Sequence, residues 1–266
     1  MMAGKSKGIT ETEKMITGIS KAAIRRKISS LRRIYLIRLL GRCCLFLFCV
    51  FLYRYHPEEL VILQENQFFQ RFSILHLIWG IWVIDMVHQI IPAGKQISLG
   101  SQKLFGQYFK STEKKWDSQQ LRQYIKEATK LAYRVFVIWA VLIVVIGILY
   151  DRKILDDSLL FMISVAFYVC DLICVLIWCP FRLIMKNRCC TTCRIFNWDH
   201  LMMFTPMLFV KGFYSYSLLF FAFAVWMIWE LAVIRYPERF WEHSNEALKC
   251  SRCTDKVCTQ YCQKPR

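Results

Sequence analysis

Seven of the thirteen cysteines lie in two short basic stretches, each of which follows a hydrophobic run. Closely spaced thiolates are the usual ligands of zinc and iron-sulfur clusters, and they also carry out disulfide exchange. The cysteines therefore predict metal or redox chemistry. The first group consists of Cys189, Cys190 and Cys193, and the second of Cys250, Cys253, Cys258 and Cys262.

The second group has the spacing C-x2-C-x4-C-x3-C, which places four soft ligands within thirteen residues. A loop of that length can surround one tetrahedral ion. The spacing differs from that of a zinc knuckle, which has histidine in the third position, and from an iron-sulfur run, which has proline where Gln263 stands. We expect a zinc or iron-sulfur site in this segment. Incidental cysteines in an unstructured tail, or disulfides on an oxidising side, are the alternatives.

The first group is followed within a short window by Asp199 and His200. Sulfur, carboxylate and imidazole ligands are thus close in sequence, so we expect a second thiol or metal site that contains Cys189, Cys190 and Cys193. A C-x2-C pair also arises in redox motifs and by chance, and in a eukaryotic host such cysteines are candidates for acylation. The isolated cysteines are expected to serve as small hydrophobic side chains. They are Cys43, Cys44, Cys49 and Cys179.

Three of the nineteen acidic residues remain inside hydrophobic runs, namely Asp85, Asp171 and Glu230. An acid at the centre of a bilayer costs about 2.5 to 3.5 kcal/mol, so each should face the bundle or a polar cavity. Asp85 and His88 are three positions apart and share one helical face. These four residues are candidates for catalysis, with interhelical hydrogen bonding as the alternative role.

The elements that position these residues are hydrophobic runs close to 20 residues long, the length that crosses a bilayer. The runs are residues 43–53 with a flank from 34, 74–92, 131–150, 159–181 and 216–234. Residues 196–213 are long enough for one further crossing, although a re-entrant piece at 201–210 would leave five spans. We therefore predict an all-α, polytopic membrane helix bundle with about six transmembrane helices.

The distribution of Lys and Arg predicts the orientation of the bundle. Residues 1–42 hold eleven Lys/Arg against two acids and residues 93–134 hold nine against three, whereas 54–73 and 151–157 each hold two against three. The first two segments are therefore expected inside, and six spans would place both termini in the cytoplasm. This orientation explains the net charge of +17 better than nucleic-acid binding does. The expected location is a bacterial cytoplasmic membrane.

Three parts of the chain are expected from these patterns. Residues 1–38 form a basic amphipathic N-terminal segment, in which residues 10–38 are expected to be a helix that lies on an anionic inner leaflet, with a capping box at Thr10 and Glu13. Residues 39–236 form the bundle, with cytoplasmic loops at 93–130 and 182–198. Residues 237–266 form a cysteine-rich cytoplasmic tail.

The function expected from these features is that of a membrane protein with a cytoplasmic cysteine metal site, either redox-linked or metal-dependent. Its thiolates would communicate with Asp85, His88 and Glu230, and it would have a membrane redox or protein partner. A transporter or ion-conducting bundle that uses Asp85, Asp171 and Glu230 is the alternative, and a non-catalytic scaffold is a third. The sequence has no P-loop, G-x-S-x-G or H-E-x-x-H motif and does not disclose a reaction.

Overall fold

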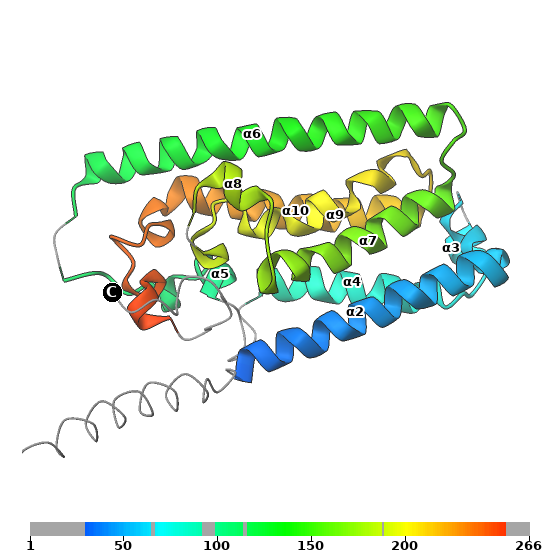
Figure 1. Cartoon of the computed structure of the whole chain (residues 1–266), viewed down its shortest axis with the longest axis horizontal. Helices are drawn as coiled ribbons and strands as arrows, with labels where there is room; N and C mark the ends of the chain where they lie inside the picture. Colours follow the sequence, from blue (N-terminus) through cyan, green and yellow to red (C-terminus); the bar gives the residue numbers. More distant parts are fainter. Residues whose placement is uncertain (1–29, 65–66, 92–98, 114–115, 188, 254–266) are drawn as a thin grey trace, which may run out of the picture.

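The structure, a computed structural model, describes residues 30–64, 67–91, 99–113, 116–187 and 189–253. These residues form α-helices and 3-10 helices and no strand, so the predicted all-α class is confirmed (Figure 1). The α-helices are α2 (Ser30–Tyr55), α3 (Gln67–Gln70), α4 (Leu75–Ile90), α5 (Leu99–Gln102), α6 (Ser118–Asp151), α7 (Asp157–Leu176), α8 (Phe181–Met185), α9 (Asp199–Phe204) and α10 (Phe213–Arg235). The 3-10 helices are η1 (Pro57–Leu63), η2 (Gly106–Tyr108), η3 (Cys190–Thr192), η4 (Phe196–Trp198), η5 (Thr205–Phe209), η6 (Pro237–Phe240), η7 (Glu246–Leu248) and η8 (Cys250–Arg252).

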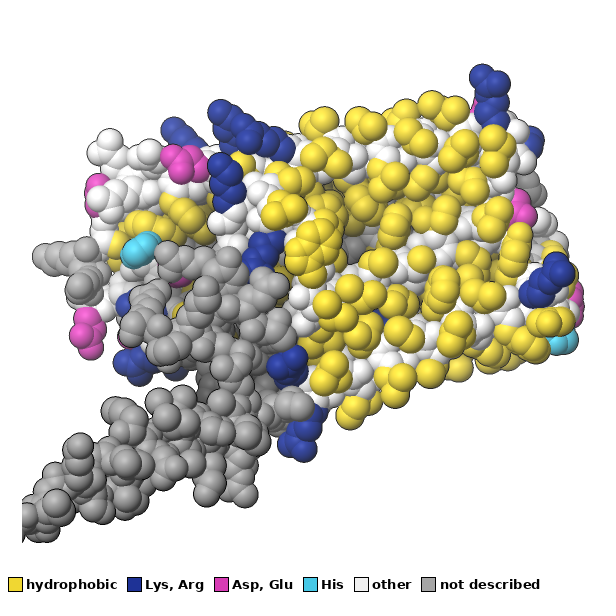
Figure 2. Space-filling view, viewed as in Figure 1, with side chains coloured by type: hydrophobic (Ala, Val, Ile, Leu, Met, Phe, Trp, Pro, Cys, Tyr) yellow, Lys and Arg dark blue, Asp and Glu magenta, His cyan; other side chains and the backbone are white. Residues whose placement is uncertain are grey.

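Four helices are long and apolar enough to cross a membrane, namely α2, α6, α7 and α10. They correspond to four of the spans expected from the sequence. Exposed apolar side chains cover their outer faces, for example Val137, Val141 and Val144 on α6. Figure 2 shows these side chains as a broad hydrophobic band with Lys and Arg near both of its ends. Apolar surface of this extent suits lipid rather than water, which indicates a membrane protein.

The other two expected spans take a different form. Helix α4 has 16 residues, and the segment 196–209 is divided into η4, α9 and η5. Helix α4 packs against α10, and α9 contacts both α7 and α10 (Figure 1). Both segments therefore belong to the bundle, but neither is one uninterrupted span of membrane length, and the count of six remains a prediction.

The first helix, α2, runs without a break from Ser30 to Tyr55. It continues through residue 38, where the sequence suggested the end of a separate amphipathic helix. Residues 1–29, and with them most of that predicted helix, lie outside the described residues.

Capping side chains fix where the long helices α6 and α7 begin. Asp117 accepts a hydrogen bond from the backbone N–H of Gln119 at 2.9 Å. At the start of α7, Asp156 accepts one from the N–H of Leu159 at 2.7 Å.

The core of the bundle is centred on Trp82 of α4, which is fully buried. The centroid of its ring lies 5.8 Å from that of Phe161, 5.9 Å from that of Tyr168 and 5.1 Å from that of Phe204. These partners belong to α7 and α9, so one aromatic side chain joins three helices.

The loops at one end of the bundle fold against each other. The Thr112 hydroxyl donates to the carbonyl of His243 at 2.8 Å, and the N–H of Glu246 donates to the carbonyl of Lys110 at 2.7 Å. The segment after α5 and the segment after α10 thus form a small cap over the bundle, at the left of Figure 1. Both η3, with Cys190, and η8, with Cys250, lie at this end, and the other described cysteines of the two groups flank them.

Helix α6 and η5 approach each other closely at Gly147, and a substitution at this glycine tests the contact. A Cβ atom at Gly147 would lie 2.5 Å from the ring of Phe209, whereas one at Gly80 would meet nothing within 4 Å. We expect Gly147→Ala to destabilise the protein by about 1 to 3 kcal/mol, because the Phe209 ring must move, and Gly80→Ala to have little effect. Unfolding in detergent measures both variants. Equal stabilities would mean that η5 does not pack against α6 in this way.

Candidate functional site

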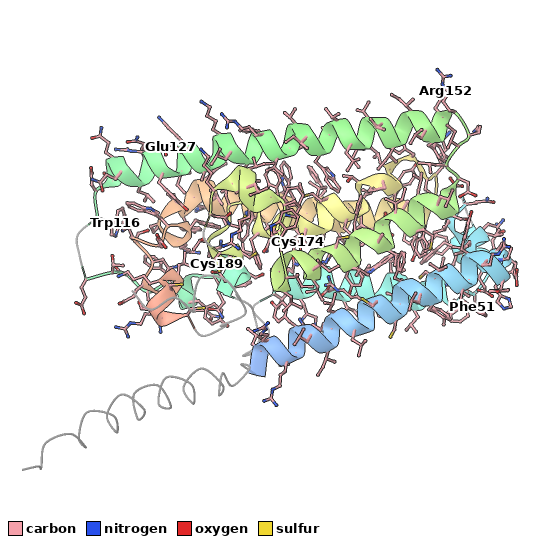
Figure 3. The ribbon with its side chains drawn as sticks, viewed as in Figure 1. Phe51, Trp116, Glu127, Arg152, Cys174 and Cys189 are labelled. Carbon is pink, nitrogen blue, oxygen red and sulfur yellow. The ribbon has the colours of Figure 1, made fainter. Side chains whose placement is uncertain are left out.

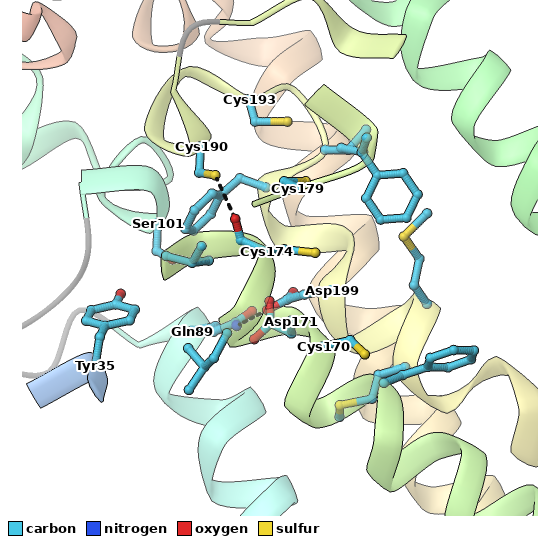
Figure 4. A pocket seen from close by; sticks show the side chains of 18 of the residues that line it. Tyr35, Gln89, Ser101, Cys170, Asp171, Cys174, Cys179, Cys190, Cys193 and Asp199 are labelled. Atoms are coloured by element: carbon cyan, nitrogen blue, oxygen red, sulfur yellow. Dashed lines mark hydrogen bonds between the residues drawn. The ribbon is translucent and has the colours of Figure 1, made fainter. Parts of the chain in front are cut away.

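A cavity of about 540 Å³ lies where the helix bundle meets the loop of the first cysteine group (Figure 4). Its polar wall contains Arg42, Asp85, His88, Gln89, Asp171 and Asp199. Its thiols are Cys170, Cys174, Cys179, Cys190 and Cys193. Its apolar wall includes Trp139, Phe167, Phe181, Met202 and Met203. The cavity therefore joins charge, sulfur and aromatic surface in one space.

Arg42 of α2 holds two of the intramembrane acids. Its Nη1 donates to Asp171 Oδ2 at 2.7 Å and to the carbonyl of Tyr168 at 2.7 Å, and its Nη2 lies 3.4 Å from Asp85 Oδ2. The guanidinium also lies 3.7 Å from the centroid of the Tyr168 ring. One cation thus connects α2, α4 and α7, and its partners satisfy the requirement that charges in a bundle be paired.

His200, near the start of α9, extends this chain of charges. Its Nε2 lies 3.6 Å from Asp85 Oδ2, and its Nδ1 lies 3.3 Å from Asp199 Oδ1. Gln89 Nε2 donates to Asp199 Oδ2 at 3.1 Å, the contact drawn in Figure 4. The polar chain therefore runs from Asp171 through Arg42, Asp85 and His200 to Asp199.

Several buried polar atoms around His200 and Asp199 lack a hydrogen bond within the described residues. They are Gln89 Oε1, Asp199 Oδ1 and both ring nitrogens of His200, whose two ion-pair contacts do not have hydrogen-bond geometry. The His200 side chain is only 4% exposed. Buried groups of this kind normally have a partner, so this part of the wall is suited to a ligand or to water.

Three thiols meet at the other side of the cavity. Cys174, in the last turn of α7 (Figure 3), and Cys179 both line the cavity, and the Cys190 thiol donates to the carbonyl of Cys174 at 3.7 Å (Figure 4). Cys179 lies just before α8. The hydrogen bond from Cys174, assisted by the backbone N–H groups of Phe181 and Arg182 and opposed by burial, lowers the pKa of Cys179 to about 7. Cys179 therefore has the character of a reactive thiol beside a second thiol.

The five residues predicted for the site at the first cysteine group lie at or near the cavity, but they differ in burial and in whether they line it. Cys193 is buried, and burial raises the pKa of its thiol. Cys189 contacts the Thr191 hydroxyl at 3.1 Å and does not line the cavity. Cys190, Cys193 and Asp199 line the cavity, and His200 lies directly behind Asp199. The predicted group is thus brought near Asp85 and Asp171.

The candidate acid Glu230 is not part of this cavity. It forms a two-point ion pair with Arg194, one contact of which is 2.8 Å, and it accepts a hydrogen bond from Trp198 Nε1 at 2.7 Å. The predicted communication of Glu230 with Asp85 and His88 is therefore not seen. His88 itself is exposed, in the last turn of α4, and its side chain borders the cavity.

The predicted metal centre in the tail is described only in part. Cys250 is exposed and Cys253 is half-buried, and both belong to the turn at η8. Cys258 and Cys262 lie outside the described residues. Among the residues that the structure describes, no three or more His, Cys, Asp or Glu side chains are arranged to hold a metal ion.

Four residues at or near the site were missed or misread at the sequence level. Cys179 was expected to be an isolated hydrophobic side chain, which is wrong, because it contacts Cys174 and faces the cavity. Arg42 was counted with the basic N-terminal segment, although it lies inside the first span. An arginine within a hydrophobic span was the signal for it. Arg194 and Lys103 belong to loops, and nothing in their sequence context indicates burial.

Lys103 is buried in the cap, with only 2% of its surface exposed. Its Nζ donates to the carbonyl of Cys193 at 3.0 Å and lies 5.0 Å from the ring centroid of Trp229 and 5.6 Å from that of Phe240. It forms no ion pair with any described carboxylate. Burial accordingly lowers its pKa from 10.5 to about 7. Lys103 thus fixes the backbone of the first cysteine group against α10.

The shifted pKa of Lys103 predicts a pH dependence of stability. Between about pH 7 and 10.5 the unfolded chain carries a proton on Lys103 that the folded protein lacks, so stability should rise with pH over this window. At and below pH 7 the folded protein bears the full cost of a buried ammonium. Lys103→Met should reduce the rise, leaving the part that the lowered pKa of Cys179 contributes over the same range, whereas Lys110→Met, at an exposed position, should keep the rise in full. Unfolding midpoints at pH 7 and 9 measure the difference, and an unchanged slope in Lys103→Met contradicts it.

The fold and the cavity define a class, a helical membrane protein with a polar, thiol-lined cavity at one end of its bundle. Comparison with protein families, with curated proteins and with solved structures gives no match for this chain.

Proposed function

We propose that this protein is a membrane-embedded thiol redox protein in which Cys174 and Cys179 cycle between dithiol and disulfide. The observation that carries the proposal is that Cys174 and Cys179 line the same cavity, which also contains Cys190 and Cys193. A thiolate with a pKa near ambient pH and an adjacent second thiol are the requirements for exchange.

The exchange connects two pairs of cysteines. The thiolate of Cys190 attacks one sulfur of a Cys174–Cys179 disulfide, which forms a mixed disulfide and releases the other sulfur as a thiolate. The Cys193 thiol gives its proton to the thiolate that has been released and attacks Cys190, which completes a Cys190–Cys193 disulfide and leaves Cys174 and Cys179 reduced. Two electrons pass between the pairs, and a cytoplasmic redox partner restores the Cys190–Cys193 dithiol. The hydrogen bond from Cys190 to the backbone of Cys174 supports the direct approach of the two pairs.

The topology that fits this function has six crossings with both termini in the cytoplasm. The lengthwise packing of α4 and of the segment 196–209 inside the bundle supports the two shorter crossings. The excess of Lys and Arg in residues 1–42 and 93–134 supports the orientation. Both cysteine groups then face the cytoplasm of a bacterial membrane. Labelling of Cys250 with a membrane-impermeant maleimide in intact and opened cells tests this orientation.

The pH profile of Cys179 alkylation tests the redox proposal. With iodoacetamide, we expect Cys179 to react with a midpoint at about pH 7, because the thiolate is the reacting species. In Cys174→Ala the midpoint should move towards the ordinary value of 9.0, because the hydrogen bond to the sulfur is lost. Mass spectrometry of the peptides measures each cysteine separately, with exposed Cys44 as an internal control. A Cys179 midpoint equal to that of Cys44 contradicts the proposal.

For the tail, we retain the proposal of a zinc or iron-sulfur site formed by Cys250, Cys253, Cys258 and Cys262. In support, Cys250 and Cys253 form a tight turn closed by a 3.3 Å hydrogen bond between the Cys253 N–H and the Cys250 carbonyl. Such a turn presents two sulfurs to one ion. Anaerobically purified protein should contain zinc or iron, and Cys250→Ser should lose it. Protein free of both metals rules the site out.

A second candidate function is ion transport, and the buried chain from Asp171 to Asp199 favours it. In that case Asp171→Asn abolishes proton or cation flux into vesicles, whereas Cys179→Ser leaves it intact. Under the redox proposal, Cys179→Ser is the inactive variant.

A further inference from the structure

We propose that the cavity binds the head ring of a membrane quinone, which accepts two electrons from Cys174 and Cys179. This inference rests on the proposed function and names its electron acceptor. The cavity has a volume of about 540 Å³, which falls within the range of about 300 to 1,000 Å³ of small-molecule sites.

The apolar part of the wall suits a flat, uncharged ring. Trp139, Phe167 and Phe181 lie on it, and the centroid of the Trp139 ring is 5.0 Å from that of Phe167. Met202 and Met203 add flexible apolar surface, which adapts to a planar ligand. These residues come from α6, α7, α8 and α9, so the surface is part of the bundle rather than of the water-facing cap.

The polar part of the wall suits the oxygens of a quinone and of its reduced form. His88 offers a ring N–H to a quinone carbonyl. On the other side of the ring, Gln89 Oε1 is a buried acceptor without a hydrogen bond within the described residues, and Asp199 Oδ1 has only its 3.3 Å contact with His200 Nδ1, so one hydroxyl of a hydroquinone can donate to either of them. A ligand that changes from acceptor to donor on reduction matches both sets of groups.

The charges of the cavity argue against other redox cofactors. Asp85, Asp171 and Asp199 all line it, and Arg42 is already bonded to two of them. The phosphates of a nicotinamide or flavin nucleotide would meet these three carboxylates against the two cations Arg38 and Arg42, so the charge of the wall as a whole repels such a ligand. A neutral quinone carries no charge to repel.

The electron transfer balances with a quinone as the oxidant. The Cys179 thiolate adds to the quinone ring, and Cys174 gives its proton to Asp171, three residues before it on α7. The Cys174 thiolate then attacks the Cys179 sulfur, so that an S–S bond forms and the C–S bond breaks. The proton from Asp171 and one proton from water end on the two oxygens of the hydroquinone. The dithiol is oxidised by two electrons and the quinone is reduced by two.

The experiment uses the full-length protein in detergent, without oxygen, with decyl-ubiquinone as the probe. We expect one equivalent of quinone to be reduced per protein, as measured by ultraviolet absorption, and a Cys174–Cys179 disulfide to appear in mass spectra. Cys179→Ser and Cys174→Ser should each lower the rate by at least about 100-fold, because each removes one of the two sulfurs of the bond. Cys44→Ser, which alters an exposed thiol, should react as the parent does.

A cavity-filling variant separates binding in the cavity from partition into detergent. Val175 lines the cavity, and Val175→Trp should lower the rate at least about tenfold by occupying the space of the ring. A folded Val175→Trp protein that reduces quinone at the parental rate overturns the assignment of the cavity. If quinone is not reduced while Cys179 keeps its alkylation midpoint near pH 7, the quinone is wrong and the thiol redox proposal stands. If the alkylation midpoint of Cys179 in the parent protein is not near pH 7, both the quinone proposal and the thiol redox proposal are wrong.

Discussion

Replacement of Arg42 by alanine is expected to destabilise the protein by about 3 to 5 kcal/mol, the usual cost of breaking a buried ion pair from one side. Arg42 is the only described residue that bonds to both Asp85 and Asp171, at 3.4 and 2.7 Å. Its side chain is 12% exposed, and those of Asp85 and Asp171 are 34% and 24% exposed at the cavity, so water would replace the lost partner of the two carboxylates only in part. Helices α2, α4 and α7 would also lose their common contact.

The measurement is the free energy of unfolding in detergent, with Arg33→Ala as the matched control. Arg33 lies on the same helix and is exposed, so its removal should change stability by less than about 0.5 kcal/mol. Arg42→Lys keeps the charge, but a single ammonium does not reproduce the fork that reaches two carboxylates and a carbonyl, so we expect only partial recovery. In the double variant Arg42→Ala/Asp171→Asn, the loss should be smaller than in Arg42→Ala alone. Equal effects of Arg42→Ala and Arg33→Ala would contradict this role.

Replacement of Glu230 by leucine is the second large effect, again about 3 to 5 kcal/mol. Glu230 binds both terminal nitrogens of Arg194 and the indole N–H of Trp198. Arg194 is 6% exposed and would remain charged and unpaired in the interior. Trp229 Nε1 donates to the carbonyl of Arg194 at 2.8 Å, so the disturbance should extend to the loop of the first cysteine group.

The Glu230→Leu variant also distinguishes a structural role of Glu230 from a role in ion transport. The expected result for Glu230→Leu is lower stability, seen as earlier unfolding on heating, with Glu113→Ala at an exposed site as the control. Arg194→Leu/Glu230→Leu should recover most of the loss, because both charges are then absent. If Glu230→Leu unfolds like the parent and instead abolishes ion flux, Glu230 belongs to a conduction path and not to the scaffold.

The local patterns of the sequence determined the helices. The hydrophobic runs predicted α2, α6, α7 and α10, because a helix that faces lipid must be apolar over the thickness of a bilayer whatever its neighbours are. An N-cap such as Asp117 is likewise a local feature, since its side chain bonds to an N–H only two residues further along the chain. Asp85 and Asp171 stood out as charges in apolar runs, and the requirement for a partner followed from that alone.

The sequence alone did not identify the partners of these residues. Arg42 meets Asp171 across 129 positions of sequence, and the match depends on how far α2 slides along α7. A shift of one helical turn, 5.4 Å, would separate them, and no local pattern fixes that register. For the same reason Glu230 was grouped with Asp85 from the sequence, whereas in the folded protein it forms an ion pair with Arg194.

The same division holds for the thiols. The C-x2-C spacing of Cys190 and Cys193 marked one pair from the sequence, because two thiols in one turn are neighbours in any fold. Cys179 looked isolated in the sequence. The low pKa of its thiol is caused by Cys174 and by the backbone N–H groups at the start of α8, and these groups surround it only in the folded protein. The sequence by itself determined a membrane helix bundle with unpaired acids and clustered thiols. Only the tertiary structure placed Arg42, Cys179 and the acids around one cavity, because burial and charge pairing depend on residues far apart in the chain.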